Sequence, residues 1–91
     1  MHRVSYNGLI ADIRDEDLQD GIACLEQESA EGREQILKSV GKALDNALDL
    51  VAAGKANFTP QQSKDIANDI GLWFANEVME GRAEQYKVAV Q

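Results

Sequence analysis

The residues between Asp15 and Glu26 come close to the pattern of a calcium-binding loop. With Asp15 as the first position, Asp17 is the third and Glu26 the twelfth, where an EF-hand loop carries its bidentate acid. The sixth position needs a glycine, so that the chain can bend around the ion, but it is Asp20, and Gly21 follows one residue late. The same residues suit a charged helix equally well. A degenerate calcium-binding module is therefore an alternative, and we assign no metal ligand.

Few residues of the chain could form a catalytic site. His2 is the only histidine, so a histidine-based triad or a multi-histidine metal site is excluded by count. Cys24 is the only cysteine, and the acids Asp20 and Glu26 near it disfavour a reactive thiolate. Carboxylate pairs can carry acid–base chemistry, but on a charged helix they are usually a solvated face. We expect no catalytic residue, no cofactor and no enzymatic activity.

Negative charge is concentrated in residues 12–34, where nine acidic residues face two arginines. The rest of the chain is nearly balanced, and the net charge is −7. Such a segment attracts basic partners and repels nucleic acid and anionic membranes. The glutamates from 28 to 34 are explained by the N-terminus of a following helix, which favours acids. The candidate partner-binding residues are the others: Asp12, Asp15, Glu16, Asp17, Asp20 and Glu26.

Two longer helices are expected to form an antiparallel pair that carries most of the core. The first, over about residues 29–53, has apolar residues at helical spacing and is followed by Gly54, which suits a left-handed C-terminal position. Thr59, Pro60 and Gln62 predict the start of the second, over about residues 60–80, with a capping box. Gly81 is expected to end it.

Both helices carry small residues four positions apart. These are Ser39, Ala43 and Ala47 on the first, and Ser63, Ala67, Gly71 and Ala75 on the second. Rows at this spacing interlock when helices pack, so we expect the pair to make contact along them. Close packing would also explain Gly71, because glycine within a helix costs about 1 kcal/mol relative to alanine.

A shorter helix, over about residues 16–28, is expected to carry most of the acids. Asp15 is its predicted cap, and Gly32 is expected to separate it from the next helix. Its apolar stripe is narrow and consists of Leu18, Ile22 and Leu25.

The two ends of the chain favour extended structure. Asn7 and Gly8 lie between apolar runs, which is typical of a β-hairpin, and Tyr86, Val88 and Val90 alternate as in a terminal strand. The predicted fold class is mainly α, a small helical bundle in one domain over residues 1–91. The alternative is an α+β fold in which the hairpin and the C-terminal strand form a small sheet.

Three residues depart from the pattern of the second long helix. Glu77 falls in its apolar arc, so its carboxylate should reach water at the helix end or be bonded internally, with Trp73 among the candidate partners. Leu72 and Met79 lie on its polar face and form a candidate self-association stripe.

These features predict a non-enzymatic acidic interaction module, an inhibitor or regulator that docks on a basic partner protein, with a nucleic-acid-binding protein the most natural choice. The alternatives are a structural homo-oligomer, with Leu72 and Met79 in a homodimer contact, and the degenerate calcium-binding module. The longest apolar run is too short for a membrane span, and no secretory signal is visible. We expect a cytoplasmic protein that binds neither membranes nor nucleic acid directly.

Overall fold

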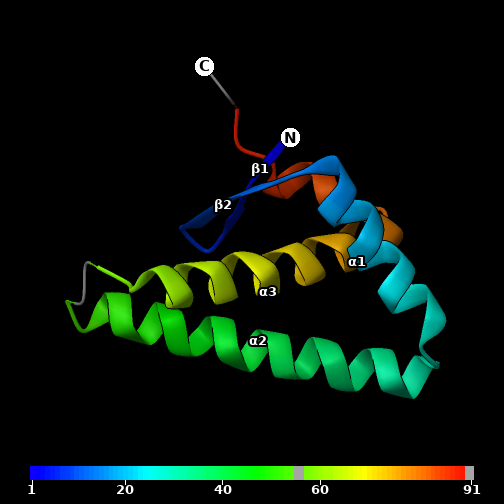
Figure 1. Ribbon diagram of the computed structural model, residues 1–91, viewed down its shortest axis with the longest axis horizontal. Coiled ribbons are helices and arrows are strands. Elements are labelled where there is room, and N and C mark those ends of the chain that lie inside the picture. The colour runs from blue at the N-terminus through cyan, green and yellow to red at the C-terminus, as the bar shows by residue number, and fades with distance from the viewer. Residues whose placement is uncertain (55–56, 90–91) are drawn as a thin grey trace.

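The computed structural model describes residues 1–54 and 57–89. A β-hairpin, β1 (His2–Tyr6) and β2 (Leu9–Ile13), precedes three helices, α1 (Asp15–Gln27), α2 (Ala30–Ala52) and α3 (Pro60–Met79), and a short 3-10 helix, η1 (Ala83–Tyr86). Figure 1 shows α3 in the middle, with α2 along one side and the hairpin on the other. The predicted fold class, mainly α, is confirmed, and a small antiparallel sheet accompanies the helices.

The hairpin forms where Asn7 and Gly8 predict it. Both turn residues have positive φ, 49° and 98°, which matches the right-handed twist of the two strands. The strands pair with Tyr6 opposite Leu9 and Val4 opposite Ala11. Val4 and Ala11 are buried, so one face of the hairpin packs on the helices.

The predicted C-terminal strand is absent from the described residues. Tyr86 instead belongs to η1, and its ring packs edge-on against Trp73, with the ring centroids 4.5 Å apart. After η1, Lys87 forms an isolated β-bridge with Val4 of β1, and the Val88 N–H donates to the Arg3 carbonyl at 2.8 Å. Val90 lies outside the described residues.

The boundary between the first two helices lies at Glu28 and Ser29, where the predicted ranges place it, but Asp15 and Gly32 do not have their predicted roles. The N-cap of α1 is Arg14, with no side-chain capping bond, and Asp15 is the first helical residue. The N-cap of α2 is Ser29, whose hydroxyl accepts a hydrogen bond from the Gly32 N–H at 3.0 Å. Gly32 therefore lies in the first turn of α2, because a serine N-cap begins a helix more effectively than an internal glycine interrupts it.

The predicted ends of α3 are confirmed. The Thr59 hydroxyl accepts from the Gln62 N–H at 3.1 Å, and the Gln62 side chain accepts from the Thr59 N–H at 2.9 Å, which completes the capping box. At the other end Gly81 has φ +76° and donates its N–H to the carbonyl of Val78. The Arg82 N–H bonds the Glu77 carbonyl, so the helix closes in a Schellman motif.

The core is organised around α3. Ile70 and Phe74 of this helix are fully buried, and β1, α1 and α2 each add one fully buried side chain, Val4, Leu25 and Leu44. Burial of each such side chain contributes about 1.5–3 kcal/mol. The hairpin and both other helices are thus held by their contacts with α3.

The expected contact along the rows of small residues is wrong for much of its length. On α2, Ser39 and Ala43 are exposed, and only Ala47 is buried. On α3, Ala75 packs against α1, because a Cβ built on Gly21 would lie 3.2 Å from the Ala75 Cβ. Periodicity defines which residues share a face of a helix, but it does not say which neighbour that face meets.

Candidate functional site

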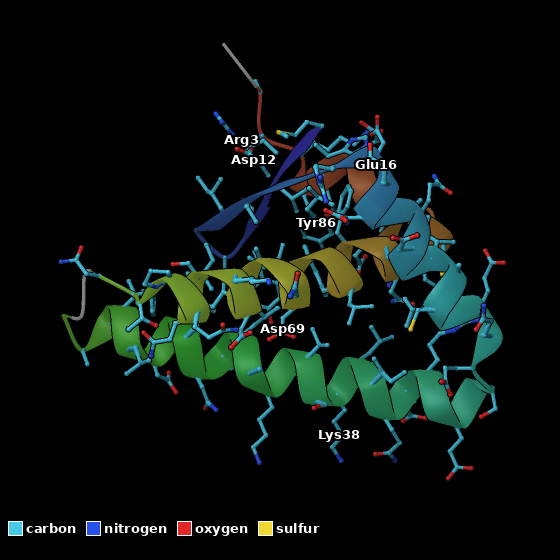
Figure 2. The ribbon with its side chains drawn as sticks, viewed as in Figure 1. Arg3, Asp12, Glu16, Lys38, Asp69 and Tyr86 are labelled. Carbon is cyan, nitrogen blue, oxygen red and sulfur yellow. The ribbon has the colours of Figure 1, made fainter. Side chains whose placement is uncertain are left out.

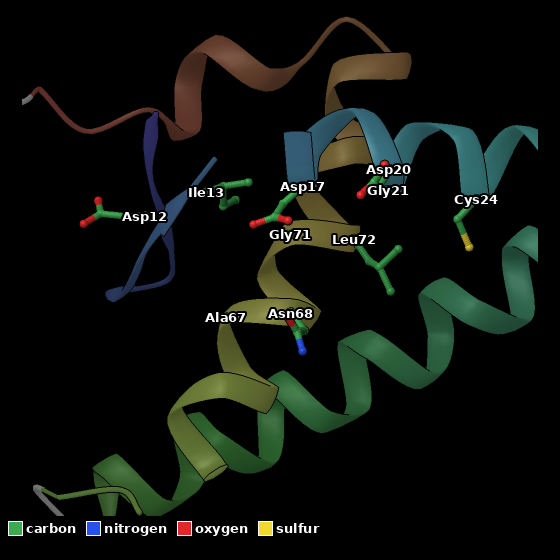
Figure 3. A pocket seen from close by; sticks show the side chains of 10 residues that line it. All are labelled: Asp12, Ile13, Asp17, Asp20, Gly21, Cys24, Ala67, Asn68, Gly71 and Leu72. Atoms are coloured by element: carbon green, nitrogen blue, oxygen red, sulfur yellow. The ribbon is translucent and has the colours of Figure 1, made fainter. Parts of the chain in front are cut away.

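An open cleft of about 310 Å³ lies between α1 and α3, beside the end of β2. Figure 3 shows this site, which we call the acidic cleft. Its lining residues are Asp12, Ile13, Asp17, Asp20, Gly21, Cys24, Ala67, Asn68, Gly71 and Leu72.

The wall formed by α1 follows from helical spacing. Asp17, Asp20 and Cys24 recur at intervals of three and four residues, so they form one stripe beside the buried side chains of Leu18 and Leu25. Burial of those leucines fixes the rotation of α1 on the core. The rotation in turn directs Asp17 and Asp20 toward α3 (Figure 3).

The wall formed by α3 is made of small and polar residues. Ala67 and Gly71 are four positions apart and face the cleft together with Asn68 and Leu72. A Cβ built on Gly71 would have no atom within 4 Å. Close packing therefore does not explain this glycine, and a side chain added at position 71 would project into open space.

Ion pairs occupy two of the three acids of the cleft. Asp12 points away from the helices and accepts from Arg3 Nε at 2.9 Å, and this hydrogen bond lowers the pKa of the Asp12 carboxyl (Figure 2). Asp17 accepts from Arg14 Nε at 3.0 Å, and the contact raises the pKa of that guanidinium. Asp20 forms no ion pair within residues 1–54 and 57–89. The uncompensated charge of the cleft is therefore concentrated at Asp20.

The other three predicted partner-binding residues do not line the cleft. Asp15 contacts His2 Nε2 at 2.7 Å, and Glu16 lies 3.9 Å from Arg14 Nη1. Glu26 is exposed near the end of α1. The predicted set thus divides, and only Asp12, Asp17 and Asp20 share one site.

The residues interpreted as a possible calcium-binding loop form a regular helix instead. Asp15 and Glu26 both belong to α1, and eleven residues of helix separate them by about 16 Å along the axis. One ion cannot contact both carboxylates at that distance. Among the described residues, no cluster of three or more candidate ligands is arranged to hold a metal ion.

A second hollow, of about 180 Å³, adjoins the acidic cleft at Ala67, which lines both. We call it the apolar hollow. Its lining residues are Leu9, Ile10, Ala11, Phe58, Ser63, Ile66 and Ala67. This hollow was not predicted from the sequence, although Ile10 offered a signal: it is an apolar residue on the outward face of the predicted hairpin and is 60% exposed.

Glu77 is buried and bonded within the chain, so the expected access to water is wrong and the alternative, an internal bond, is correct. It keeps only 7% of its surface exposed and forms two hydrogen bonds with Arg82, at 2.8 and 3.3 Å. The turn at Gly81 brings Arg82 back beside the helix, and a periodicity argument confined to the helix could not find this partner. Trp73, the candidate partner named from the sequence, forms no hydrogen bond with Glu77 among the described residues.

Leu72 and Met79 are both half-buried and pack against the core. A Cβ built on Gly21 would lie 3.9 Å from Leu72 Cδ2, so Leu72 borders α1. Much of this stripe is therefore already in contact within the chain, and its use in self-association stays a prediction.

Comparisons of the chain with models of protein families, with curated proteins and with solved structures yield no match. In the part of the chain that the structure describes, no helix combines the length and apolar character that a membrane crossing requires.

Proposed function

We propose that this chain is a non-enzymatic interaction module that holds a basic segment of a partner protein in the acidic cleft and thereby inhibits or regulates that partner. The observation that carries the proposal is that Asp17 and Asp20 of α1 both point toward α3 across one cleft, with Asp20 left without an ion pair among the described residues. An arginine or lysine of the partner would supply the missing positive charge. The proposed setting is the cytoplasm, where a lone cysteine stays reduced.

The shape of the site supports a side chain as its occupant. The cleft is walled on one side by carboxylates and on the other by the small residues Ala67 and Gly71, so a long side chain can enter without displacing the core. A phosphate backbone would meet repulsion from the same carboxylates. The chemistry of the cleft therefore favours a basic protein over nucleic acid itself.

The test is affinity capture from a lysate of the organism that makes the protein. Wild type is compared with the double variant Asp17→Asn, Asp20→Asn and with a control, Glu31→Gln, Glu34→Gln. Both variants change the net charge from −7 to −5, and the control residues are exposed acids near the start of α2, outside the cleft.

A basic protein captured by wild type and the control, but lost by the cleft variant, is the expected result. Equal loss in both variants would mean that net charge alone drives capture, and equal retention would mean that the partner binds elsewhere. Either result would contradict the proposal.

A further inference from the structure

Among the residues that the structure describes, one edge of the hairpin has no hydrogen-bonding partner. Tyr6 and Leu9 flank a two-residue turn and form a hydrogen-bonded pair, so the pairs then alternate and Ile10 and Asp12 direct their backbone groups outward from β2. Within the described residues, no backbone group of Ile10 or Asp12 takes part in a hydrogen bond outside the hairpin. The opposite edge differs, because the Val88 N–H occupies the outward carbonyl of Arg3.

The acidic cleft and the apolar hollow follow this free edge. Neighbouring residues of a strand point to opposite faces, so a hollow lined by Leu9, Ile10 and Ala11 in succession runs along the edge of the strand. The acidic cleft continues it at Asp12 and Ile13. Together the two sites form a continuous groove, which we call the edge groove.

The floor of the edge groove is the row of small residues on α3. Ser63 lines the apolar hollow, Ala67 lines both sites and Gly71 lines the acidic cleft. A third strand would lie about 4.8 Å from β2, above this row, and its inward side chains would need the space that these small residues leave.

We infer that the free edge of β2 accepts an extended segment of the basic partner as a third strand, with its inward side chains in the edge groove. An aliphatic side chain fills the apolar hollow beside Leu9 and Ile66, and an arginine or lysine two residues away reaches Asp17 and Asp20. This inference rests on the proposed function and adds the conformation and the side-chain pattern of the bound segment.

Charge decides between a partner and a second copy of this chain. Two copies paired through β2 would bring two acidic clefts together, and each chain carries a net charge of −7. Like charges brought face to face oppose association. The carboxylates that would repel a second copy attract a basic segment.

The test uses a capped peptide of seven residues with the sequence Thr-Val-Thr-Arg-Thr-Val-Thr. Its central arginine has a valine two residues away on both sides, so the pattern fits either strand direction. Binding is measured by fluorescence anisotropy, beside a peptide with glutamate in place of the arginine. We expect the glutamate peptide to bind at least about tenfold more weakly.

Two N-methylated versions of the arginine peptide separate strand addition from attraction of side chains. One is methylated on the backbone nitrogens of its threonines, and the other on those of the valines and arginine. In a third strand, only the N–H groups of the threonines or only those of the valines and arginine face β2. One methylated version should therefore lose binding, and the other should keep it. The version that loses binding also identifies the strand direction.

The matching change in the protein is Ile10→Pro, compared with Ile10→Thr. Proline removes the outward N–H of position 10 and leaves the pairing of β1 with β2 intact, because that N–H is not part of the ladder. We expect the proline variant to lose the peptide and the threonine variant to keep it. Gly71→Leu is the second variant, since it fills the floor of the groove where a Cβ meets nothing.

Failure of the peptide to bind, or equal binding of both methylated versions and of Ile10→Pro, would overturn the inference. The second pattern would leave the proposed function standing, because charge alone would then hold the segment. If the chain sedimented as a dimer without peptide, and peptide addition converted the dimer to a monomer, a second copy would be the occupant instead. The capture experiment with Asp17 and Asp20 judges the proposed function separately.

Discussion

Packing within the chain does not explain why position 71 is a glycine. It stands in the middle of α3, where glycine costs about 1 kcal/mol relative to alanine, and a Cβ at this position would meet nothing within 4 Å. The substitution Gly71→Ala should therefore raise the free energy of unfolding by about 0.5–1 kcal/mol in urea titrations.

The matched control for Gly71 is Gly21 of α1, which also lies inside a helix. A Cβ there would sit 3.2 Å from the Ala75 Cβ, so Gly21→Ala should gain less stability than Gly71→Ala or lose stability outright. Equal gains from the two substitutions would show that close approach of α1 to α3 does not require Gly21.

Asp69 should make the stability of the chain depend on pH. It lies on the side of α3 toward α2 (Figure 2), and burial, followed by repulsion from Asp65, raises the pKa of its carboxyl above the ordinary value of 3.8. The folded state therefore holds this proton more tightly than the unfolded state. The charged form costs stability above the folded-state pKa, and the cost disappears below the unfolded-state pKa.

It follows that Asp69→Asn should be more stable than wild type at pH 7 and equal to it near pH 3, where both side chains are uncharged. Urea unfolding at the two pH values measures the difference. A variant that is less stable than wild type at pH 7 would show that the Asp69 carboxylate has a stabilising contact.

Among the elements, local rules predicted the three α-helices and the hairpin from the sequence, whereas η1 was expected to be part of a strand. Thr59, Pro60 and Gln62 placed the start of α3 correctly because a capping box is complete within four residues. The position of α1 on α3 was not predictable, since it depends on how Gly21 and Ala75 meet across more than fifty residues of chain. The partner of Glu77 was missed for the same reason, because it lies beyond the helix end.

The cap of α3 should contribute measurably to the stability of the fold. Thr59→Ala removes the hydroxyl that accepts from Gln62 and should lower the free energy of unfolding by about 1 kcal/mol. Thr59→Ser keeps the acceptor and should change stability much less. Thermal or urea unfolding of the two variants gives the comparison, and equal losses would contradict the capping role.

At the scale of the whole molecule, the excess of acids in residues 12–34 was visible in the sequence, but its distribution on the surface was not. Four of the predicted acids are matched by Arg3, Arg14 or His2, and three of the six line one cleft. Net charge counts every acid equally. Asp20 differs from the other acids because it points from α1 toward α3 and forms no ion pair within the described residues.

Whether the acidic cleft holds a basic partner can be decided from the dissociation constant of the captured partner. It should be measured for wild type, for Asp17→Asn, Asp20→Asn and for Glu31→Gln, Glu34→Gln, at low and at physiological ionic strength. We predict that the cleft variant binds at least about tenfold more weakly, that the control stays close to wild type, and that salt weakens wild type more than the cleft variant. Equal dissociation constants for the two variants, or binding by wild type that does not change with salt, would show that the acidic cleft does not hold the partner.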